Sequence, residues 1–214
     1  PLALAHSAIV AGFDERNDDA LAKTARDVKA AGGTLVAQLW HPGRQQLWQP
    51  SHSPMGVSDQ PDAYSWTVPH VMSAAELKRL GDAYVNVALR LERLGFDGIE
   101  LHGAHGYLLT QLLSPWSNTR TDEYGGPIEN RTRLIRDIAE AIRHGVDRPF
   151  IVGLKMPADE GVSGGIDPEE AAAITRRLAE TTHFDYFAYG QGNFSISLEN
   201  HVPDMHFQAG HFIE

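Results

Sequence analysis

The sequence contains no cysteine, so neither a disulfide nor a cysteine-ligated metal or iron–sulfur cluster can form within its 214 residues. Basic residues are also scarce. The 18 Lys and Arg against 28 Asp and Glu give a formal net charge of −10, which argues against general affinity for nucleic acid or anionic membranes. No apolar run approaches the ~18 residues of a membrane span, and no signal-peptide pattern opens the chain. A cytoplasmic protein with a small-molecule substrate is therefore expected.

Helical and strand patterns alternate along the whole chain. A composition of 42% hydrophobic and 21% charged residues is typical of one globular unit, and residues 1–214 show no internal domain boundary. The expected strands cover residues 34–40, 96–101, 150–156 and 185–189. The expected helices cover about 17–31, 73–94, 105–113, 128–144 and 167–181. Strands separated by helices of this length indicate parallel pairing with right-handed crossovers.

This order favours a (β/α)₈ TIM barrel. Such a barrel typically needs ~250 residues and eight strand–helix units, and only about four are visible, so the chain is interpreted as a central portion lacking strands at both ends. A smaller open sheet is the alternative. In three of the strands one face is aliphatic and the other turns polar toward the carboxyl end. If the polar faces converge on a barrel axis, Gln38, His102 and Lys155 gather at its catalytic mouth.

The most informative segment follows the second strand. Residues 96–101 have the length of a strand buried on both faces, and His102, His105 and Tyr107 come directly after it in a Gly-containing turn. These side chains donate hydrogen bonds or protons, which is what a catalytic rim requires. Residues 41–72 are long for a loop inside a compact domain, which indicates an active-site excursion rather than a linker.

Two long motifs resemble one family. The segment HGAHGYLLTQLLSPWSNTRTDEYGGPIENR (102–131) resembles the old yellow enzyme family of FMN-dependent oxidoreductases, and LVAQLWHPGRQ (35–45) resembles that family's third-strand segment. The resemblance covers essentially the whole chain, from just after the family's second strand to just after its sixth. Within the family, the sequence is closer to the branch of 2,4-dienoyl-CoA reductase and trimethylamine dehydrogenase. It implies a TIM barrel that binds FMN and uses NAD(P)H.

The resemblance also implies roles at the flavin. Gln38 matches the glutamine that hydrogen-bonds the flavin pyrimidine edge, where a carboxamide supplies a donor and an acceptor together. Lys155 stands where the family usually has an arginine beside flavin N1 and O2, and a cation there stabilises the charge that develops on reduction. Lysine keeps the charge but loses the planar fork, so flavin affinity or redox potential can differ from the family norm.

The same resemblance implies roles at the substrate. His102 and His105 match the paired side chains that bind a substrate carbonyl or an anionic ligand above the flavin, and Tyr107 matches the proton donor. Trp40 is a candidate for the substrate mouth. The implied reaction is reduction of an activated C=C bond: NAD(P)H reduces FMN, reduced FMN passes hydride to the alkene, and Tyr107 protonates the neighbouring carbon.

Structural interpretations compete with several of these assignments. Gln38 can simply bond a neighbouring loop, and Lys155 can form an ion pair with Glu100. Trp48 and Trp66 can line the mouth or pack beneath the long loop. A loop-stiffening role is expected for Arg120, Asp122, Glu123 and Tyr124. A structural role is expected for His41, His52, His70, His144 and His201.

Other functions stay open at this stage. One is an amine dehydrogenase of the same family. Another is a metal-dependent barrel hydrolase that uses His102 and His105 with His41 or Asp159, whereas the flavin interpretation needs no metal. A third is a fragment that binds FMN poorly alone, because the family holds the FMN phosphate after its seventh and eighth strands. An iron–sulfur cluster in a longer parent, the substrate and a homo-oligomeric state are not decided by these residues.

Overall fold

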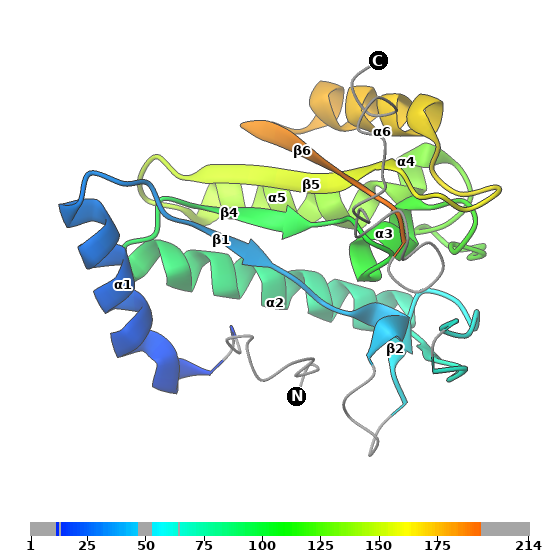
Figure 1. The fold of residues 1–214 in the computed structure, drawn as a ribbon, viewed down its shortest axis with the longest axis horizontal. Helices are drawn as coiled ribbons and strands as arrows, with labels where there is room; N and C mark the ends of the chain where they lie inside the picture. The colour runs from blue at the N-terminus through cyan, green and yellow to red at the C-terminus, as the bar shows by residue number, and fades with distance from the viewer. Residues whose placement is uncertain (1–11, 13, 47–52, 64, 194–214) are drawn as a thin grey trace, which may run out of the picture.

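The computed structural model describes residues 12, 14–46, 53–63 and 65–193. Its main sheet has the four parallel strands β1 (Val36–Leu39), β4 (Gly98–His102), β5 (Ile151–Asp159) and β6 (Tyr186–Gln191). They lie side by side in chain order, β1-β4-β5-β6 (Figure 1). Consecutive parallel strands that neighbour one another are the arrangement of a (β/α)₈ barrel wall, which confirms the predicted fold class for this part of the chain.

Helices connect these strands. The longer ones are α1 (Asp18–Ala30), α2 (Ala74–Arg93), α5 (Arg133–Gly145) and α6 (Pro168–Thr181). The shorter elements are 3₁₀ turns at Glu15–Asn17 and Gly43–Gln45, helices α3 (Leu108–Leu113) and α4 (Ile128–Arg131), and the paired strands β2 (Met55–Gly56) and β3 (His70–Val71). Figure 1 shows α2 and α5 running along the sheet, with α3 beyond the carboxyl end of β4. No helix in the described ranges has the length and apolarity of a membrane span.

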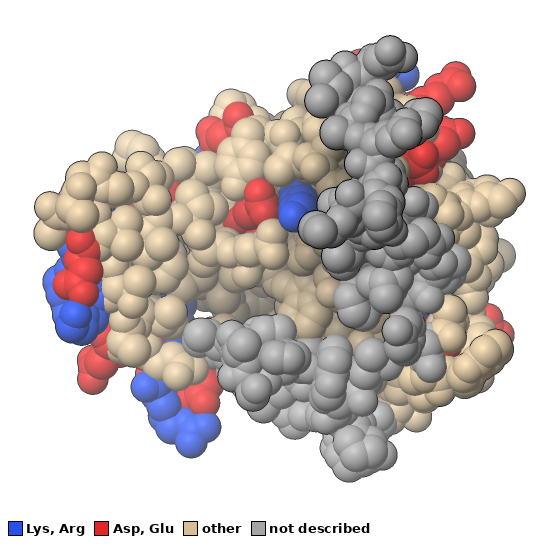
Figure 2. Space-filling view, viewed as in Figure 1, with Lys and Arg blue, Asp and Glu red and all other residues tan. Residues whose placement is uncertain are grey.

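The core lies between the sheet and its helices. Ile99, Leu101, Val152 and Leu154 alternate along β4 and β5 and are fully buried. They belong to one apolar cluster with residues of α2 and α5, among them Leu77, Leu80, Ala88, Ile135, Ile138 and Ile142. The opposite face of the strands carries the polar residues, so the predicted two-faced strand pattern is confirmed. Figure 2 shows one side of the molecule, where charged side chains gather mainly over α1 and beside α6.

The helix ends follow the expected chemistry. Ser73 and Glu76 form a complete capping box at the start of α2, and Asp167 caps α6 by accepting from the Glu170 N–H. Gly32 and Gly95 follow α1 and α2 with positive φ, as residues that end a helix in the left-handed conformation do.

Two helices differ from the prediction. The helix expected at 128–144 is divided at Thr132, whose hydroxyl donates to the Ile128 carbonyl at 2.7 Å and competes with the helical ladder. The short helix begins at Leu108 rather than 105, because His105 and Gly106 both have positive φ. Asn17 stands at the N-cap of α1 without a side-chain hydrogen bond to the helix.

We predict that Ser73→Ala lowers the free energy of unfolding by about 1 kcal/mol at neutral pH, since the variant loses the cap. Hydrogen bonds from the Ser73 backbone and side chain, followed by one from His70, lower the pKa of Glu76 from 4.5 to about 2. The stabilising ionised form is therefore present above pH 4.5 and lost as the pH falls toward 2. Urea unfolding should show the difference between parent and variant shrinking over that range, and a constant difference would contradict the capping box.

Candidate active site

The strand register brings the predicted side chains to one face in two layers. Gln38 on β1 pairs in register with Glu100 on β4, which pairs with Gly153 on β5 and, through it, with Tyr186 on β6. His102 pairs with Lys155, and Lys155 with Ala188, so they form the next layer toward the carboxyl ends. Gln38, His102 and Lys155 therefore share one face of the sheet, with Gln38 one layer below the other two.

Four aromatic rings cluster at the carboxyl end of the sheet, in and above the upper layer. The His102 ring lies 5.1 Å from the His105 ring and 5.1 Å from the Tyr107 ring, centroid to centroid, and both pairs meet edge to face. Trp40 packs edge-on against Tyr107 at 5.0 Å. Edge-to-face contacts stabilise aromatic clusters and fix ring orientation. The structure thus brings together both histidines, the tyrosine and the tryptophan that the sequence singled out.

Tyr107 keeps its proton in this setting. Burial raises the pKa of the half-buried phenol above its ordinary value of 10.0, because the ionised form is desolvated. The phenol is therefore fully protonated at neutral pH and can act as an acid.

The turn that carries His105 has an unusual backbone. His105 has a φ of 63°, in the left-handed region that non-glycine residues rarely occupy, and Gly106 follows with a φ of 76°. The Gln111 side chain donates to the Gly106 carbonyl at 2.8 Å. Such a backbone persists only where its surroundings hold it.

A buried polar network holds the turn at His105 in place. The Gln45 amide donates to the His105 carbonyl at 3.1 Å and to the Asn193 side chain at 3.4 Å, and Asn193 donates to the Glu160 carboxylate at 2.9 Å. Asn193 also forms a parallel bridge with His105, and it and Glu160 are fully buried. Three loops, after β1, β5 and β6, therefore converge on the turn after β4.

A buried cation lies in the same region. Arg44 is 2% exposed, stacks on the Trp116 ring at 4.7 Å and donates to the Gln60 side chain. Burial lowers its pKa to about 10, opposed by the negative charges of Glu160 and Asp62. The guanidinium remains charged at neutral pH and partly balances the buried Glu160 carboxylate.

Gly190 leaves room where Lys155 and His105 meet. A Cβ added to Gly190 would lie 2.8 Å from His105 Nε2 and 3.4 Å from Lys155 Cε. The absence of a side chain on β6 at this point therefore lets both side chains approach the same place above the sheet.

The alternative of a Lys155–Glu100 ion pair is not realised, and Glu100 has other contacts. Gln38 Nε2 donates to Glu100 Oε1 at 2.6 Å, and the Glu100 carboxylate also interacts with the Tyr186 phenol, whose pKa it raises. Within the described ranges, no ion pair joins Lys155 to Glu100. The register explains this, because Glu100 lies beside Gly153 while Lys155 lies one layer higher beside His102.

The remaining candidates take structural positions. His41 is buried and accepts from the Gly43 N–H, and its pKa falls to about 4 because burial disfavours the charged form. Arg120 bonds Asp122 and the carbonyls of Val57 and Met72, which confirms the loop-stiffening cluster. His70 bonds Glu76, and His144 bonds the Glu140 carbonyl.

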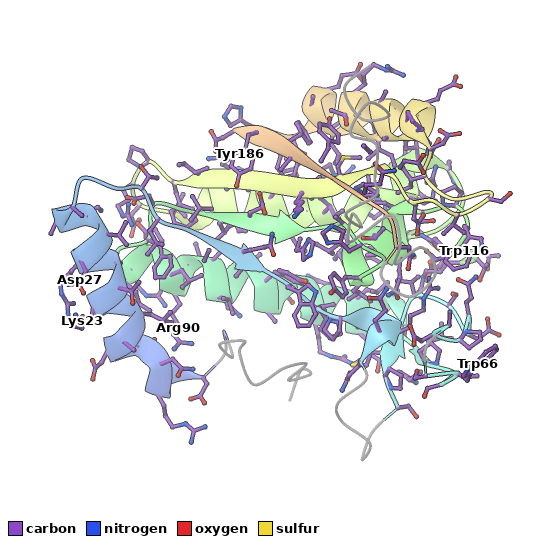
Figure 3. The ribbon with its side chains drawn as sticks, viewed as in Figure 1. Lys23, Asp27, Trp66, Arg90, Trp116 and Tyr186 are labelled. Carbon is purple, nitrogen blue, oxygen red and sulfur yellow. The ribbon has the colours of Figure 1, made fainter. Side chains whose placement is uncertain are left out.

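Trp66 does not line the cluster of rings, because it is 80% exposed and lies far out on its loop (Figure 3). Trp48, His52 and His201 lie outside the described residues. Among the residues that are described, no group of three His, Asp or Glu side chains is placed to hold a metal ion, so the hydrolase alternative has no ligand set there.

Sequence reasoning missed Gln45, Asn193 and Glu160. The three residues bond one another across separations of 33 to 148 positions in the chain, and each is unremarkable in its local pattern. The one available signal was the Gly106 next to the second histidine, which marks a left-handed turn that needs support.

An arc of parallel strands with donor side chains at their carboxyl ends defines the class of barrel oxidoreductases and hydrolases. Comparison with known proteins identifies the family within this class. Residues 3–196 match the model of the NADH:flavin oxidoreductase / NADH oxidase family, and the chain belongs to that family. FMN, with NADH or NADPH as reductant, is the cofactor of this family, as the sequence motifs implied.

Individual relatives agree. The chain is 39% identical over 190 residues to the NADH-dependent flavin oxidoreductase nadA of Aspergillus parasiticus, covering 85% of this chain and 42% of that protein. It is 37% identical to an NADPH dehydrogenase of Clostridium acetobutylicum, covering 76% and 48%. Histamine dehydrogenase from Rhizobium sp. 4-9 superposes with a TM-score of 0.77 at 26% identity, covering 85% of this chain and 27% of that chain. The chain thus spans about half the length of the curated relatives it matches or less.

We predict that Gly106→Ala destabilises the protein more than the matched change Gly126→Ala. Both glycines have φ near 77°, so both variants pay about 1–2 kcal/mol for a left-handed alanine. At Gly106 the new Cβ would also lie 2.5 Å from Asn193 Cγ, whereas at Gly126 nothing lies within 4 Å. Equal urea midpoints for the two variants would show that the Asn193 contact does not hold this turn.

Proposed function

We propose that the whole protein is an FMN-dependent oxidoreductase that uses NAD(P)H to reduce the activated C=C bond of an enone or a related substrate. The observation that carries this proposal is the cluster of His102, His105 and Tyr107 at the carboxyl end of β4, in a chain that belongs to a flavin oxidoreductase family. Bound FMN would supply the hydride for the β-carbon, after taking it from NADH or NADPH.

The residues present suit a flavin. Gln38 presents an amide and Lys155 an ammonium group, and the small residues Ala188 and Gly190 on β6 let the Lys155 and His105 side chains approach the same place. We propose that Gln38 bonds the pyrimidine edge and that Lys155 lies beside N1 and O2. An amide and a cation are the donor set that a flavin pyrimidine needs when it gains negative charge.

Three side chains are proposed to act on the substrate, with Trp40 beside them. His102 and His105 donate N–H groups to the substrate oxygen and stabilise the enolate charge that develops there. Tyr107 then protonates the neighbouring carbon, for which its retained proton qualifies it. Trp40 packs against Tyr107 and limits how the ring can turn.

The direct test uses the full-length protein. Purified protein should be yellow and should consume NADH or NADPH when cyclohexenone is added under anaerobic conditions. A colourless full-length protein without flavin absorbance would overturn the proposal. Oxidation of histamine or trimethylamine without turnover of enones would favour amine dehydrogenation, the second candidate, which the likeness to histamine dehydrogenase supports.

Tyr107→Phe should slow the oxidative half-reaction by about 10²–10⁴-fold and leave reduction of FMN by NAD(P)H nearly unchanged, because the phenol is assigned only to protonating the substrate. Since the raised pKa keeps Tyr107 protonated at neutral and mildly alkaline pH, ionisation of this phenol should cause no fall in the rate of that half-reaction between about pH 7 and 9. Stopped-flow traces for each half-reaction check both statements. Equal slowing of the two halves would reject the role.

Lys155→Met should lower the flavin midpoint potential, because the reduced form would lose its nearest cation. Each tenfold loss in preference for reduced FMN corresponds to about 30 mV for a two-electron couple. Lys155→Arg is the matched control, which keeps the charge and should keep the potential. Spectroelectrochemical titration of the three proteins compares them, and an unchanged potential in Lys155→Met would place the lysine away from the flavin.

A further inference from the structure

The lower layer of the sheet joins side chains from three strands across a fourth. Glu100 on β4 accepts a hydrogen bond from Gln38 on one side, and its carboxylate interacts with the Tyr186 phenol on the other. Tyr186 belongs to β6, two strands away from β4, so its side chain must cross β5 to reach Glu100. Figure 3 shows the Tyr186 side chain extending over β5.

Gly153 makes this crossing possible. It is the β5 residue in register between Glu100 and Tyr186. A Cβ added to Gly153 would overlap the tip of the Tyr186 ring, so any larger residue would push the phenol away from Glu100. Burial, first, and the interaction with the Glu100 carboxylate, second, raise the pKa of the Tyr186 phenol to about 12, so the phenol keeps its proton at neutral pH.

The Glu100 carboxylate determines how the Gln38 amide is oriented. A carboxylate only accepts hydrogen bonds, so the amide nitrogen of Gln38 must face Glu100 and the amide oxygen must face away from it. A neutral partner in place of Glu100 would accept and donate equally, and the amide would lose its preferred orientation.

We propose that Glu100, held by Tyr186 through the gap at Gly153, is a positioning residue that presents Gln38 Oε1 to the N3–H of the flavin. This inference rests on the proposed function, because it assumes that Gln38 meets the pyrimidine edge. Neither Glu100 nor Tyr186 needs to touch the flavin, since both act through the orientation of one amide.

The test measures FMN affinity in full-length variants by fluorescence titration of the apoprotein. Glu100→Gln and Tyr186→Phe should each weaken FMN binding by about 3- to 10-fold, the effect of one misplaced hydrogen bond. Gly153→Ala should resemble Tyr186→Phe, since its Cβ displaces the same ring. Tyr189→Phe is the matched control on the same strand: Tyr189 bonds Thr175 of α6 instead, so its loss should leave FMN affinity unchanged.

A positioning role predicts one further result. In a Gln38→Ala background, Glu100→Gln and Tyr186→Phe should have no further effect on FMN affinity, because the amide they orient is gone. Additive losses in that background, or unchanged affinity in the single variants, would overturn the inference while leaving the proposed function standing. A parent protein that binds no FMN would overturn both.

Discussion

The in-register parallel pairing of four strands is the constraint on which the rest of this structure depends. Parallel strands in register place residues of the same layer side by side, so apolar residues such as Ile99 and Val152 face the helices together and the polar residues face the other way together. A shift of one residue in one strand would exchange the two faces and bury Glu100 against α2 and α5. The core and the site are therefore specified by the same hydrogen-bond ladder, and neither can be rearranged without the other.

Glycines in β5 and β6 make room for the side chains of the site. Glycine usually weakens a strand, since it contributes no packing and costs entropy. Here the Tyr186 ring occupies the space where a Gly153 side chain would lie, and His105 and Lys155 occupy the space where a Gly190 side chain would lie. The empty Cβ positions are thus filled by side chains from neighbouring strands. This exchange lets groups two strands apart meet, which ordinary alternation along one strand does not provide.

The sequence was sufficient to predict the helices, the strands and the two faces of each strand, but not which side chains contact one another. Hydrophobic period and capping residues predicted all four main strands and the long helices, because those signals are local. They also placed His102, His105 and Tyr107 at one strand end. The alternative of an ion pair between Lys155 and Glu100 stayed open in the sequence, because alternation shows that two residues share a face and says nothing about their layer. Only the register puts Glu100 beside Gly153. The division of the fourth expected helix at Thr132 was missed for a different reason, since a threonine within a helical pattern reveals its hydroxyl's partner only in three dimensions.

The two layers also differ in how they are held. The lower layer is held within the sheet, by the hydrogen bond from Gln38 on β1 to Glu100 on β4 and by the interaction of Glu100 with the Tyr186 phenol of β6. The upper histidine turn is held from outside it, by Gln45 after β1 and Asn193 after β6. Because Asn193 lies just beyond the end of β6, the left-handed backbone of His105 has its full support only once β6 has paired with β5. Sheet completion and site geometry are consequently coupled: the left-handed backbone of His105, the residue proposed to hold the substrate oxygen, depends on the same sheet that holds Gln38, Glu100 and Lys155 in register.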